Sequence, residues 1–411
     1  MSDNRRNRFR IGMVLLEPFP EDIRVEKEAS NLAKKGYEIY LLCLGREGEP
    51  AEERVGEIYV RRIMPTSKLT GKIDSSIFLL TLKRPFWKRK IGQFIYDFHL
   101  DALHVHDLPL CGTGLKVARK RGLFFIADFH ENYPYGLQLW EEETRWRDIV
   151  KRPFKALKRW LKYESEIVES SNATIVDSPE FKSRLVYSGL PEDKIEVVRN
   201  TIALDLFDEP GDFFKDYFEG KFVIVYLGVL SPQKGLSLVV EALPQIVKRV
   251  PNAVFFAVGR GYDRHIEGLK NRAVELGVGE NLEFHARIPH RSIFSVLKAA
   301  DIAILHLKYN IDYRSCSPHK LFEYMAAGLP VVVSPAESVA RIVESEGIGY
   351  VVGYEPTEMA EAIVKLATDD DLRHAMGEAG KAAVKREYNW ENDGSRLVEL
   401  YDRILENKGK E

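Results

Sequence analysis

The segment Ser317–Ser334, SPHKLFEYMAAGLPVVVS, is the most informative stretch of the 411-residue chain. Its Ser-Pro pair predicts a helix start, because serine is a favourable N-cap and proline suits the first helical position. Such a helix start attracts phosphate, and Lys320 and Glu323 share one face of the helix. Gly328 ends the helix, and residues 331–333 are typical of a buried parallel strand. These features favour a diphosphate site with a carboxylate for ribose hydroxyls; an ordinary surface helix with a Lys-Glu pair is the alternative.

Length and composition indicate a globular protein with two domains. The chain exceeds one usual core, and 45% of its residues are hydrophobic and 30% charged. A net charge of −2 argues against general nucleic-acid binding. The three cysteines are too few and too scattered for a disulfide framework or zinc knuckle, which suits a reducing cytoplasm. No apolar run approaches the roughly 20 residues that span a bilayer, and the run before Glu17 is too short for a signal peptide.

Short apolar segments alternate with amphipathic ones, which is typical of doubly wound parallel sheets. A helix is expected over residues 25–35 with Gly36 as its C-terminal cap, and residues 205–220 are the predicted linker. The predicted domains are residues 1–205 and 206–388, and residues 389–411 are expected to form a helix that returns to the first domain. The predicted strands are residues 11–16, 39–44, 58–62, 102–106, 124–128, 173–176, 222–227, 254–258, 282–285, 302–305 and 331–333.

In the second half, several strands end in residues that suit a phosphate group. Gly228 lets the backbone approach a ligand, and Lys234 can reach a phosphate as a point charge. Gly259 follows the next strand, and the turn at Arg287-Ile288 follows the third. Ligands of open α/β sheets bind at this edge, so these residues together predict a nucleotide site. Each segment alone is also compatible with an ordinary strand-to-helix turn.

In the first half, polar residues follow three predicted strands. His130, in residues 128–134 (DFHENYP), can hold a sugar hydroxyl or exchange a proton, or it is a structural histidine beside a turn. Residues 20–24 (PEDIR) form the first strand-to-helix turn and either contact a ligand or are exposed charges. His104 and His106 alternate on one strand, but nothing downstream supplies further metal ligands at suitable spacing. We therefore expect no metal, and interpret His106 and Asp107 as polar groups lining a cleft.

Two stretches combine basic and aromatic residues. Residues 83–90 read KRPFWKRK, and residues 145–162 hold eight basic residues among aromatic and leucine side chains with one acid, Asp148. This pattern suits in-plane binding to an anionic membrane surface, and a solvated helix face is the alternative. The basic residues of the longer stretch are Arg145, Arg147, Lys151, Arg152, Lys155, Lys158, Arg159 and Lys162.

Over essentially its whole length the chain resembles glycosyltransferase family 4. The resemblance implies the α/β GT-B fold, in which two doubly wound Rossmann-like domains face each other across a cleft. It also implies a nucleotide-sugar donor bound mainly by the second domain, retention at the anomeric carbon, and no metal or other cofactor. The segments that carry it are FPEDIRVEKEASNLAKKGYEI (19–39), HVHDLPL (104–110), DFHENYP (128–134), VVRNTI (197–202), YLGVLSPQKGL (226–236), VGRGYDR (258–264), PHKLFEYMAAGLPVVVSP (318–335) and YNW (388–390).

Within this resemblance, Lys234 matches the diphosphate-binding lysine and Glu323 the glutamate that holds ribose hydroxyls. The backbone around Ile288 matches the base-reading turn, and His130 the histidine near the transferred sugar. The predicted catalytic residues are His130, Lys234, Lys320 and Glu323. The predicted donor-binding residues are Gly228, Lys234, Gly259, Arg260, Arg287, Ile288, Ser317, Lys320 and Glu323, and the acceptor-side residues are Asp22, Arg24, His106, Asp107, His130 and Glu131.

Three positions depart from the family pattern. Val229 stands where many members carry arginine, Ser315 replaces the first of two glutamates, and the PEDIR turn replaces a Gly-Gly pair. Lys320 is a candidate for the missing positive charge. The departures leave the identity of the donor sugar open.

The function implied is a retaining glycosyltransferase that acts on a lipid-linked glycan, glycolipid or other glycan, in polysaccharide or protein-glycan assembly. We expect it in the cytoplasm, at the inner face of the membrane as a peripheral protein, with no nucleic-acid partner. One alternative is a nucleotide-sugar epimerase of similar shape. The other, suggested by Val229 and Ser315, is a degenerate nucleotide-sugar-binding subunit.

Overall fold

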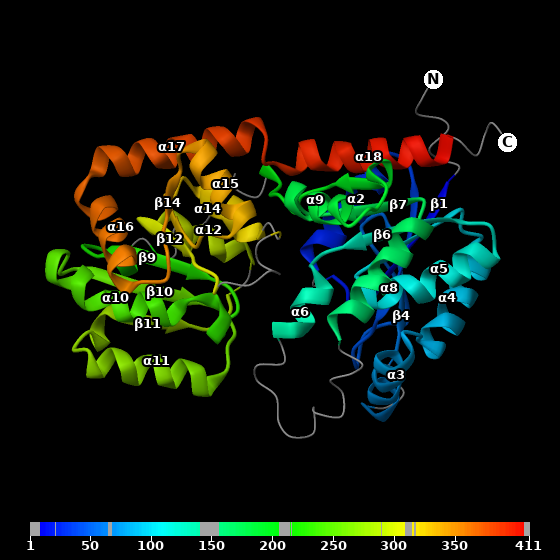
Figure 1. Ribbon diagram of the computed structural model, residues 1–411, viewed down its shortest axis with the longest axis horizontal. Helices are drawn as coiled ribbons and strands as arrows, with labels where there is room; N and C mark the ends of the chain where they lie inside the picture. Colours follow the sequence, from blue (N-terminus) through cyan, green and yellow to red (C-terminus); the bar gives the residue numbers. More distant parts are fainter. Residues whose placement is uncertain are drawn as a thin grey trace. The chain divides into compact units, whose positions relative to one another are not determined.

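A computed structural model describes residues 9–20, 22–64, 68–139, 156–204, 214, 216–288, 290–308, 315 and 318–406. Contacts along the chain divide it into two compact units, which Figure 1 shows as two α/β assemblies. The first unit comprises Met1–Arg199 with Asp393–Glu411, and the second comprises Asn200–Asn392.

The first unit is built on an eight-stranded sheet in the order β3-β4-β2-β1-β5-β6-β7-β8. All neighbouring strands are parallel except the β3–β4 hairpin. Ile11 of β1 aligns with Ile39 of β2 on one side and with Ala102 of β5 on the other, so the order in which strands are added reverses between β1 and β5. The strands are β1 (Arg10–Pro18), β2 (Glu38–Leu44), β3 (Glu52–Val55), β4 (Ile58–Ile63), β5 (Ala102–His106), β6 (Phe124–Phe129), β7 (Ala173–Val176) and β8 (Ile195–Val197).

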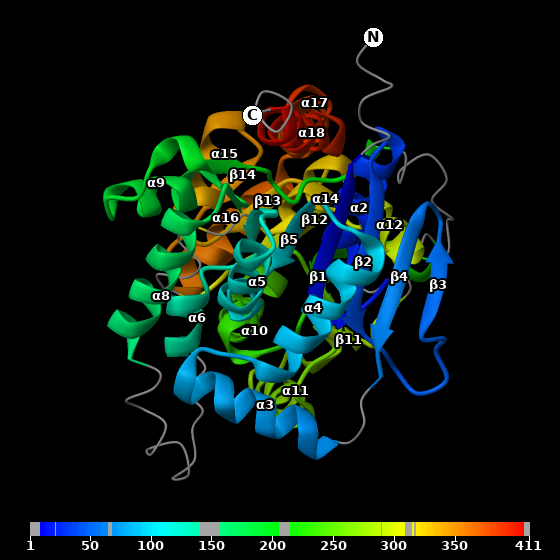
Figure 2. The ribbon, with the colours of Figure 1, turned by 90° about the vertical axis from the view of Figure 1, so that its right-hand side faces the viewer.

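Amphipathic helices cover this sheet, and Figure 2 shows α4 and α5 on the face nearer the viewer. In α4, the buried residues Trp87, Ile91, Phe94 and Ile95 recur at helical spacing, so one stripe packs into the core of the first unit. The helices are α2 (Ile23–Lys34), α3 (Lys68–Thr81), α4 (Pro85–Phe98), α5 (Leu108–Lys120), α6 (Tyr133–Leu139), α8 (Leu157–Ser170) and α9 (Pro179–Tyr187).

The C-terminal helix α18 (Trp390–Glu406) packs with the first unit from Asp393 onward. Leu397 and Tyr401 on its inner face are fully buried. The Tyr37 hydroxyl donates to Asp402 Oδ1 at 2.6 Å, and Asn31 Nδ2 donates to the Gly394 carbonyl at 2.8 Å. Apolar packing and hydrogen bonds therefore both hold this helix to the first unit.

The second unit has a six-stranded parallel sheet in the order β11-β10-β9-β12-β13-β14. In chain order this is the Rossmann arrangement 3-2-1-4-5-6, whose switch point lies between its first and fourth strands, here β9 and β12. The strands are β9 (Phe222–Leu227), β10 (Ala253–Val258), β11 (Leu282–His285), β12 (Ile302–Leu305), β13 (Val331–Val333) and β14 (Gly349–Val351). The helices are α10 (Leu236–Arg249), α11 (Asp263–Glu275), α12 (His290–Lys298), α14 (His319–Ala327), α15 (Glu337–Glu346), α16 (Pro356–Thr368) and α17 (Asp370–Arg386).

The alternation of strands and helices expected from the sequence is confirmed, with local corrections. Strands β3, β8 and β14 were not predicted; each has only three or four residues and lies at a sheet edge. Most of the predicted linker, residues 205–220, lies outside the described residues. The last residues of this segment do not form a linker, because the 3₁₀ turn Asp216–Phe218 packs on the second sheet. The ring centroids of Phe218 and Phe256 are 4.9 Å apart.

Candidate functional site

Two glycines at the C-terminal edge of the second sheet allow an unusually close approach of backbone segments. Gly228 follows β9 with φ 142°, and Gly259 follows β10 with φ 157°. A Cβ on Gly259 would lie 1.7 Å from the Gly228 carbonyl oxygen. The Gly228 amide donates to the Val258 carbonyl at 2.9 Å, which fixes the two loops together. A side chain at Gly259 is therefore incompatible with this edge.

Lys320 lies directly against the loop that follows β9. A Cβ on Gly228 would lie 2.5 Å from Lys320 Cε and 3.3 Å from its Nζ. Lys320 is in the first turn of α14, whose N-cap is Pro318 without a side-chain cap. The prediction that Pro318 is the first helical residue is therefore wrong by one position. Ser317, which the sequence predicted as the N-cap, lies outside the described part of the chain.

Lys234 lies at the switch point of the second sheet. It ends the 3₁₀ turn Pro232–Lys234 between β9 and α10, and its side chain is half-buried. The Lys308 amide, just after β12, donates to the Gln233 carbonyl at 3.0 Å. This hydrogen bond holds the Lys234 loop beside the end of β12, at the switch point where the strand order of the sheet reverses.

Glu323 is buried one turn after Lys320, on the same side of α14 as the sequence predicted. His319 Nε2 lies 3.3 Å from Glu323 Oε1, and His319 Nδ1 lies 2.8 Å from the Asn200 carbonyl oxygen. Because a carbonyl only accepts, Nδ1 of His319 is the donor in that contact. His319 is a neighbour of Glu323 that the sequence interpretation missed, although histidine four residues before a glutamate on a helix is a recognisable signal.

The remaining predicted donor residues lie at the same sheet edge with more solvent access. Arg260 and Arg287 are exposed, and Ile288 is half-buried after β11. Val229, which stands where the family pattern has arginine, is 56% exposed beside Gly228. The structure thus brings Gly228, Gly259 and Lys320 into direct proximity, whereas the two arginines are not held in place by contacts of their side chains among the described residues.

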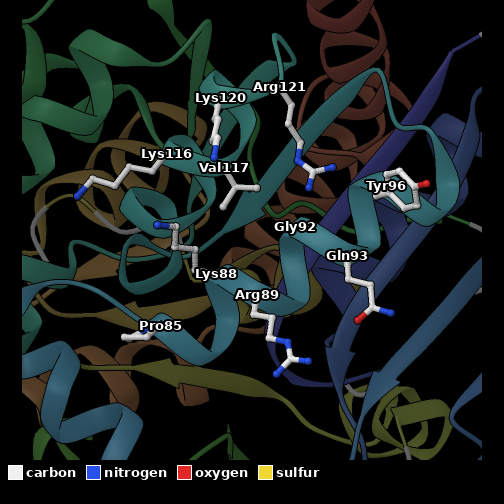
Figure 3. A pocket seen from close by; sticks show the side chains of 10 residues that line it. All are labelled: Pro85, Lys88, Arg89, Gly92, Gln93, Tyr96, Lys116, Val117, Lys120 and Arg121. Atoms are coloured by element: carbon white, nitrogen blue, oxygen red, sulfur yellow. The ribbon is translucent and has the colours of Figure 1, made fainter.

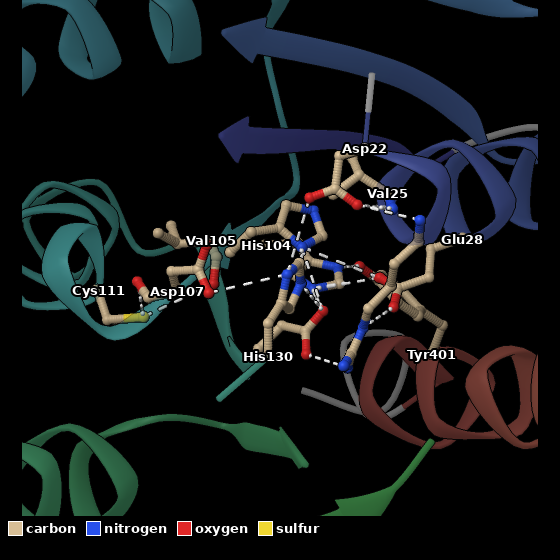
Figure 4. Close-up of polar contacts among 12 residues, drawn as sticks. Asp22, Val25, Glu28, His104, Val105, Asp107, Cys111, His130 and Tyr401 are labelled. Carbon is tan, nitrogen blue, oxygen red and sulfur yellow. Dashed lines mark hydrogen bonds and ion pairs between the residues drawn. The ribbon is translucent and has the colours of Figure 1, made fainter. Parts of the chain in front are cut away.

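In the first unit, a cluster of charged and histidine side chains surrounds Asp128, near the end of β6. Figure 4 shows Glu28, His104 and His130 of this cluster close together. Arg24 Nη2 donates to Asp128 Oδ1 at 2.6 Å, and Arg24 Nε donates to Glu28 Oε1 at 2.9 Å. His106 Nδ1 and His130 Nε2 lie 3.1 Å and 3.2 Å from Asp128 Oδ2. The Asp128 carboxylate therefore joins elements that are far apart in sequence.

A second layer of polar groups orients this cluster. His104 Nε2 lies 3.4 Å from Asp128 Oδ2, and His104 Nδ1 lies 2.8 Å from the Tyr401 hydroxyl on α18. Asp107 Oδ1 lies 3.7 Å from His130 Nδ1 on the more exposed side. Asp107 adopts φ 64° with ψ 138°, a backbone conformation that residues other than glycine rarely adopt and that recurs at functional sites.

Burial and mutual attraction set the charges in the cluster. Burial disfavours the imidazolium of His130, but attraction from Asp107 and Asp128 outweighs it and raises the pKa of His130 to about 10. Burial would raise the pKa of Asp128, yet Arg24 and His130 hold that pKa well below its usual range. Burial and repulsion by Asp128 raise the pKa of Glu28 to about 8. Near neutral pH the cluster thus holds two cations, Arg24 and His130, around ionised Asp128.

Two predicted acceptor-side residues need correction. Arg24 is only 4% exposed and His106 is fully buried, so neither lines a cleft or contacts an acceptor in this conformation. Arg24 instead donates hydrogen bonds to the side chains of Glu28 and Asp128. Burial and repulsion by His104 lower the pKa of His106 to about 3, which keeps its imidazole neutral. The partly exposed members are Asp22, Asp107, His130 and Glu131.

The sequence interpretation missed Glu28 and Asp128, and its reason for rejecting a metal was incomplete. Possible ligand atoms of Glu28, His104, His106 and Asp128 lie within 4.8 Å of one another, so carboxylates do reach the two histidines. Arg24 donates to both carboxylates and supplies the positive charge there, which favours an ion-paired network over a metal site. Both residues carried a signal: Asp128 ends a predicted apolar strand, and Glu28 lies on the apolar face of α2.

Two tryptophans of the basic stretches, Trp87 and Trp160, are internal. Trp87 is 2% and Trp160 is 1% exposed, so these rings belong to the core and cannot insert into a membrane surface. Arg159 donates to the carbonyls of Leu79 and Leu80. Residues 145–155 lie outside the described part of the chain, and none of the described helices has the length and apolarity needed to cross a bilayer.

Comparison with known proteins identifies the family. The family description "Glycosyltransferase Family 4" matches residues 23–206, and "Glycosyl transferases group 1" matches residues 209–383. The chain is 25% identical over 333 residues to a phosphatidyl-myo-inositol mannosyltransferase of Mycobacterium tuberculosis, which covers 78% of both chains.

Solved structures agree on the fold. Sucrose-phosphate synthase from Thermosynechococcus elongatus aligns with a TM-score of 0.78 at 18% identity, covering 97% of this chain and 100% of that chain. Anabaena HepE in complex with UDP and glucose aligns with a TM-score of 0.74 at 15% identity, covering 96% of this chain and 100% of that chain. The two family descriptions, both of glycosyltransferases, favour a transferase over an epimerase. The chain therefore belongs to glycosyltransferase family 4 and is a glycosyltransferase of the GT-B fold.

Proposed function

We propose that the protein transfers a sugar, with retention of anomeric configuration, from a nucleoside diphosphate sugar to a glycolipid or lipid-linked glycan. The observation that carries the proposal is the placement of Lys320 against Gly228, beside the switch point of a Rossmann sheet and one turn before buried Glu323. Nucleotide ligands of such sheets bind at this edge. The complex of the structural relative HepE with UDP and glucose supports a nucleotide sugar as donor.

The leaving diphosphate is the group that most needs stabilisation in this reaction. Lys234, Lys320 and the start of α14 supply positive charge where negative charge develops as the bond between the anomeric carbon and the phosphate oxygen breaks. We assign Glu323 to the ribose hydroxyls, because its buried carboxylate can accept two hydrogen bonds. The acceptor oxygen forms its bond on the same face of the sugar, and its proton passes to the leaving phosphate. No protein nucleophile and no metal takes part in this scheme.

In the first unit, we assign His130 as a hydrogen-bond donor to a sugar hydroxyl. The sequence left open whether this residue holds a hydroxyl or exchanges a proton. A pKa raised to about 10 favours the first role, because an imidazolium at neutral pH donates from both nitrogens and has no free lone pair to act as a base. Its side chain is 15% exposed, so a ligand can reach it.

The lipid character of the acceptor rests on a relative and on surface charge. The mycobacterial relative is named for a phosphatidyl-myo-inositol acceptor. With Trp87 and Trp160 buried, we base attraction to an anionic membrane on basic side chains among the described residues, such as those of residues 83–90. We propose peripheral attachment at the inner face of the cytoplasmic membrane on this electrostatic basis.

Donor binding and transfer can be tested together. A panel of UDP-, GDP- and ADP-sugars is screened by thermal shift, since a ligand present at 100 times its Kd stabilises the native state by about 2.7 kcal/mol. The donor that binds is then incubated with glycolipid acceptors, and the anomeric configuration of the product is determined by NMR. Lys320→Gln should weaken donor binding at least about tenfold, whereas Lys298→Gln, an exposed lysine of the same unit, should not. Equal donor affinity in both variants would refute the assigned site.

A further inference from the structure

A hollow of about 540 Å³ lies between α4 and α5 of the first unit (Figure 3). Its α4 wall includes Lys88 and Arg89 of the basic stretch 83–90, so the binding of a lipid headgroup here would rest on the membrane attachment proposed above. Among its lining residues, five are lysine or arginine and none is acidic. The residues that line it are Pro85, Lys88, Arg89, Gly92, Gln93, Tyr96, Lys116, Val117, Lys120 and Arg121.

The positive charges of this hollow are not neutralised by the protein. The five basic side chains are all exposed, and within the described part of the chain none of them forms an ion pair or a side-chain hydrogen bond. Other basic residues of the same unit do: Arg61 pairs with Glu52 and with Asp97, each at 2.6 Å. Gathering several like charges around one hollow costs free energy and creates a strong local positive potential. An anionic ligand would relieve this repulsion.

The shape of the hollow suits a phosphate group rather than a diffuse surface contact. A Cβ on Gly92 would lie 3.6 Å from Arg121 Nη2, so the guanidinium reaches over the bare glycine of α4. In Figure 3, Lys120 and Arg121 extend from α5 towards α4, where Lys88 lies. Lysine and arginine are the usual partners of phosphate oxygens, and the volume lies in the range of small-molecule sites.

The hollow is separate from the cluster around His130. Asp107 immediately precedes α5, whereas Lys116 and Lys120 lie in its last turns. With a rise of 1.5 Å per residue, these lysines are roughly 13–20 Å further along the helix axis. We propose that this hollow, the α4–α5 pocket, is a second site that binds a phosphate or diphosphate group, carried either by a lipid headgroup or by a soluble ligand.

Two probes test the proposal on the full-length protein at low salt. Inorganic pyrophosphate is titrated by calorimetry, and binding is measured to phosphatidylcholine vesicles with and without phosphatidic acid. The variant Lys88→Gln/Lys120→Gln removes one charge from each wall. The control Lys34→Gln/Lys35→Gln removes two exposed charges elsewhere in the same unit. Thermal unfolding of each variant checks that the fold is intact.

We expect the pocket variant to lose about fivefold in affinity per charge, or roughly 25-fold in total, while the control changes little. A loss towards pyrophosphate identifies a soluble ligand. A loss confined to vesicles with phosphatidic acid identifies a lipid headgroup. The proposal is overturned if wild type binds neither probe, or if pocket and control variants lose affinity equally. Pyrophosphate can also occupy the proposed donor site, so it is titrated into Lys320→Gln as well, and only the affinity that this variant retains is assigned to the α4–α5 pocket.

Discussion

Replacing Asp107 by asparagine tests how the charge on His130 is maintained. Asp107 Oδ1 lies 3.7 Å from His130 Nδ1, on the side of the imidazole away from Asp128. Asparagine has nearly the same size and shape as aspartate, so the substitution places no new steric demand on the backbone at φ 64° and ψ 138°. No side-chain cap is lost, because Asp107 makes no capping hydrogen bond to α5. The substitution therefore removes a charge with little change to the backbone.

The expected effect follows from the distance. Two unit charges 3.7 Å apart attract by about 4.5 kcal/mol at an effective dielectric constant of 20. One pKa unit corresponds to about 1.4 kcal/mol, so the pKa of His130 should fall by about three units from its value of about 10. The wild-type imidazolium stabilises the fold fully below about pH 6.5, and this contribution is lost as the pH rises towards 10. In Asp107→Asn the loss is complete near pH 7.

The pKa of His130 can be measured by NMR titration of imidazole Cε1–H signals, with His130→Gln used to assign the resonance. Asp193→Asn, an exposed carboxylate elsewhere in the first unit, is the matched control and should leave the titration unchanged. In parallel, the turnover of Asp107→Asn should decline above about pH 7, where wild type remains active. A His130 that titrates near 6.5 in wild type, or still near 10 in the variant, would refute the electrostatic reasoning.

Three further predictions concern the other parts of the site. Lys234→Ala should reduce turnover at least about tenfold in steady-state assays, because a positive charge beside the leaving diphosphate is lost; unchanged turnover would contradict the assignment. Gly259→Ala should lower both the melting temperature and the donor affinity more than Gly228→Ala does. The new Cβ at position 259 would lie 1.7 Å from a carbonyl oxygen, whereas a Cβ at position 228 would meet a flexible side chain. A larger loss in Gly228→Ala would contradict this reasoning. Tyr401→Phe removes the hydroxyl that lies 2.8 Å from His104 Nδ1, and it should lower the free energy of unfolding by about 1–3 kcal/mol, as measured by urea titration. An unchanged midpoint of the urea transition would contradict this prediction.

The strands and helices were predictable because their signals are local. Six predicted strands, including 102–106 and 222–227, coincide with the observed bounds, since a continuous apolar run flanked by turn residues marks a buried parallel strand. The edge strands β3, β8 and β14 escaped because three or four residues carry too little pattern. Pro318 was misplaced by one position because helix ends depend on cap geometry rather than on composition.

The candidate site was predictable in part. Parallel strands place their C-terminal ends at one edge, so Gly228 and Gly259 were expected near each other before any coordinates. Their sequence positions could not reveal that Lys320 packs against Gly228, because this contact depends on the angle at which α14 leaves the sheet. The burial of Trp87 could not be predicted from the sequence either, because basic and aromatic residues alternate in the same way on helices that face a membrane and on helices that face a core.

The amino-acid sequence by itself determined the two α/β units and the family, because apolar periodicity and glycine at strand ends report on local backbone and burial. Only the tertiary structure decided which charges meet. Arg24, Asp107 and Asp128 come from separate segments of the chain, and their distances from His130 set its protonation. Electrostatic attraction depends on the distance between charges in space and on the exclusion of water, and neither quantity can be obtained from the order of residues along the chain.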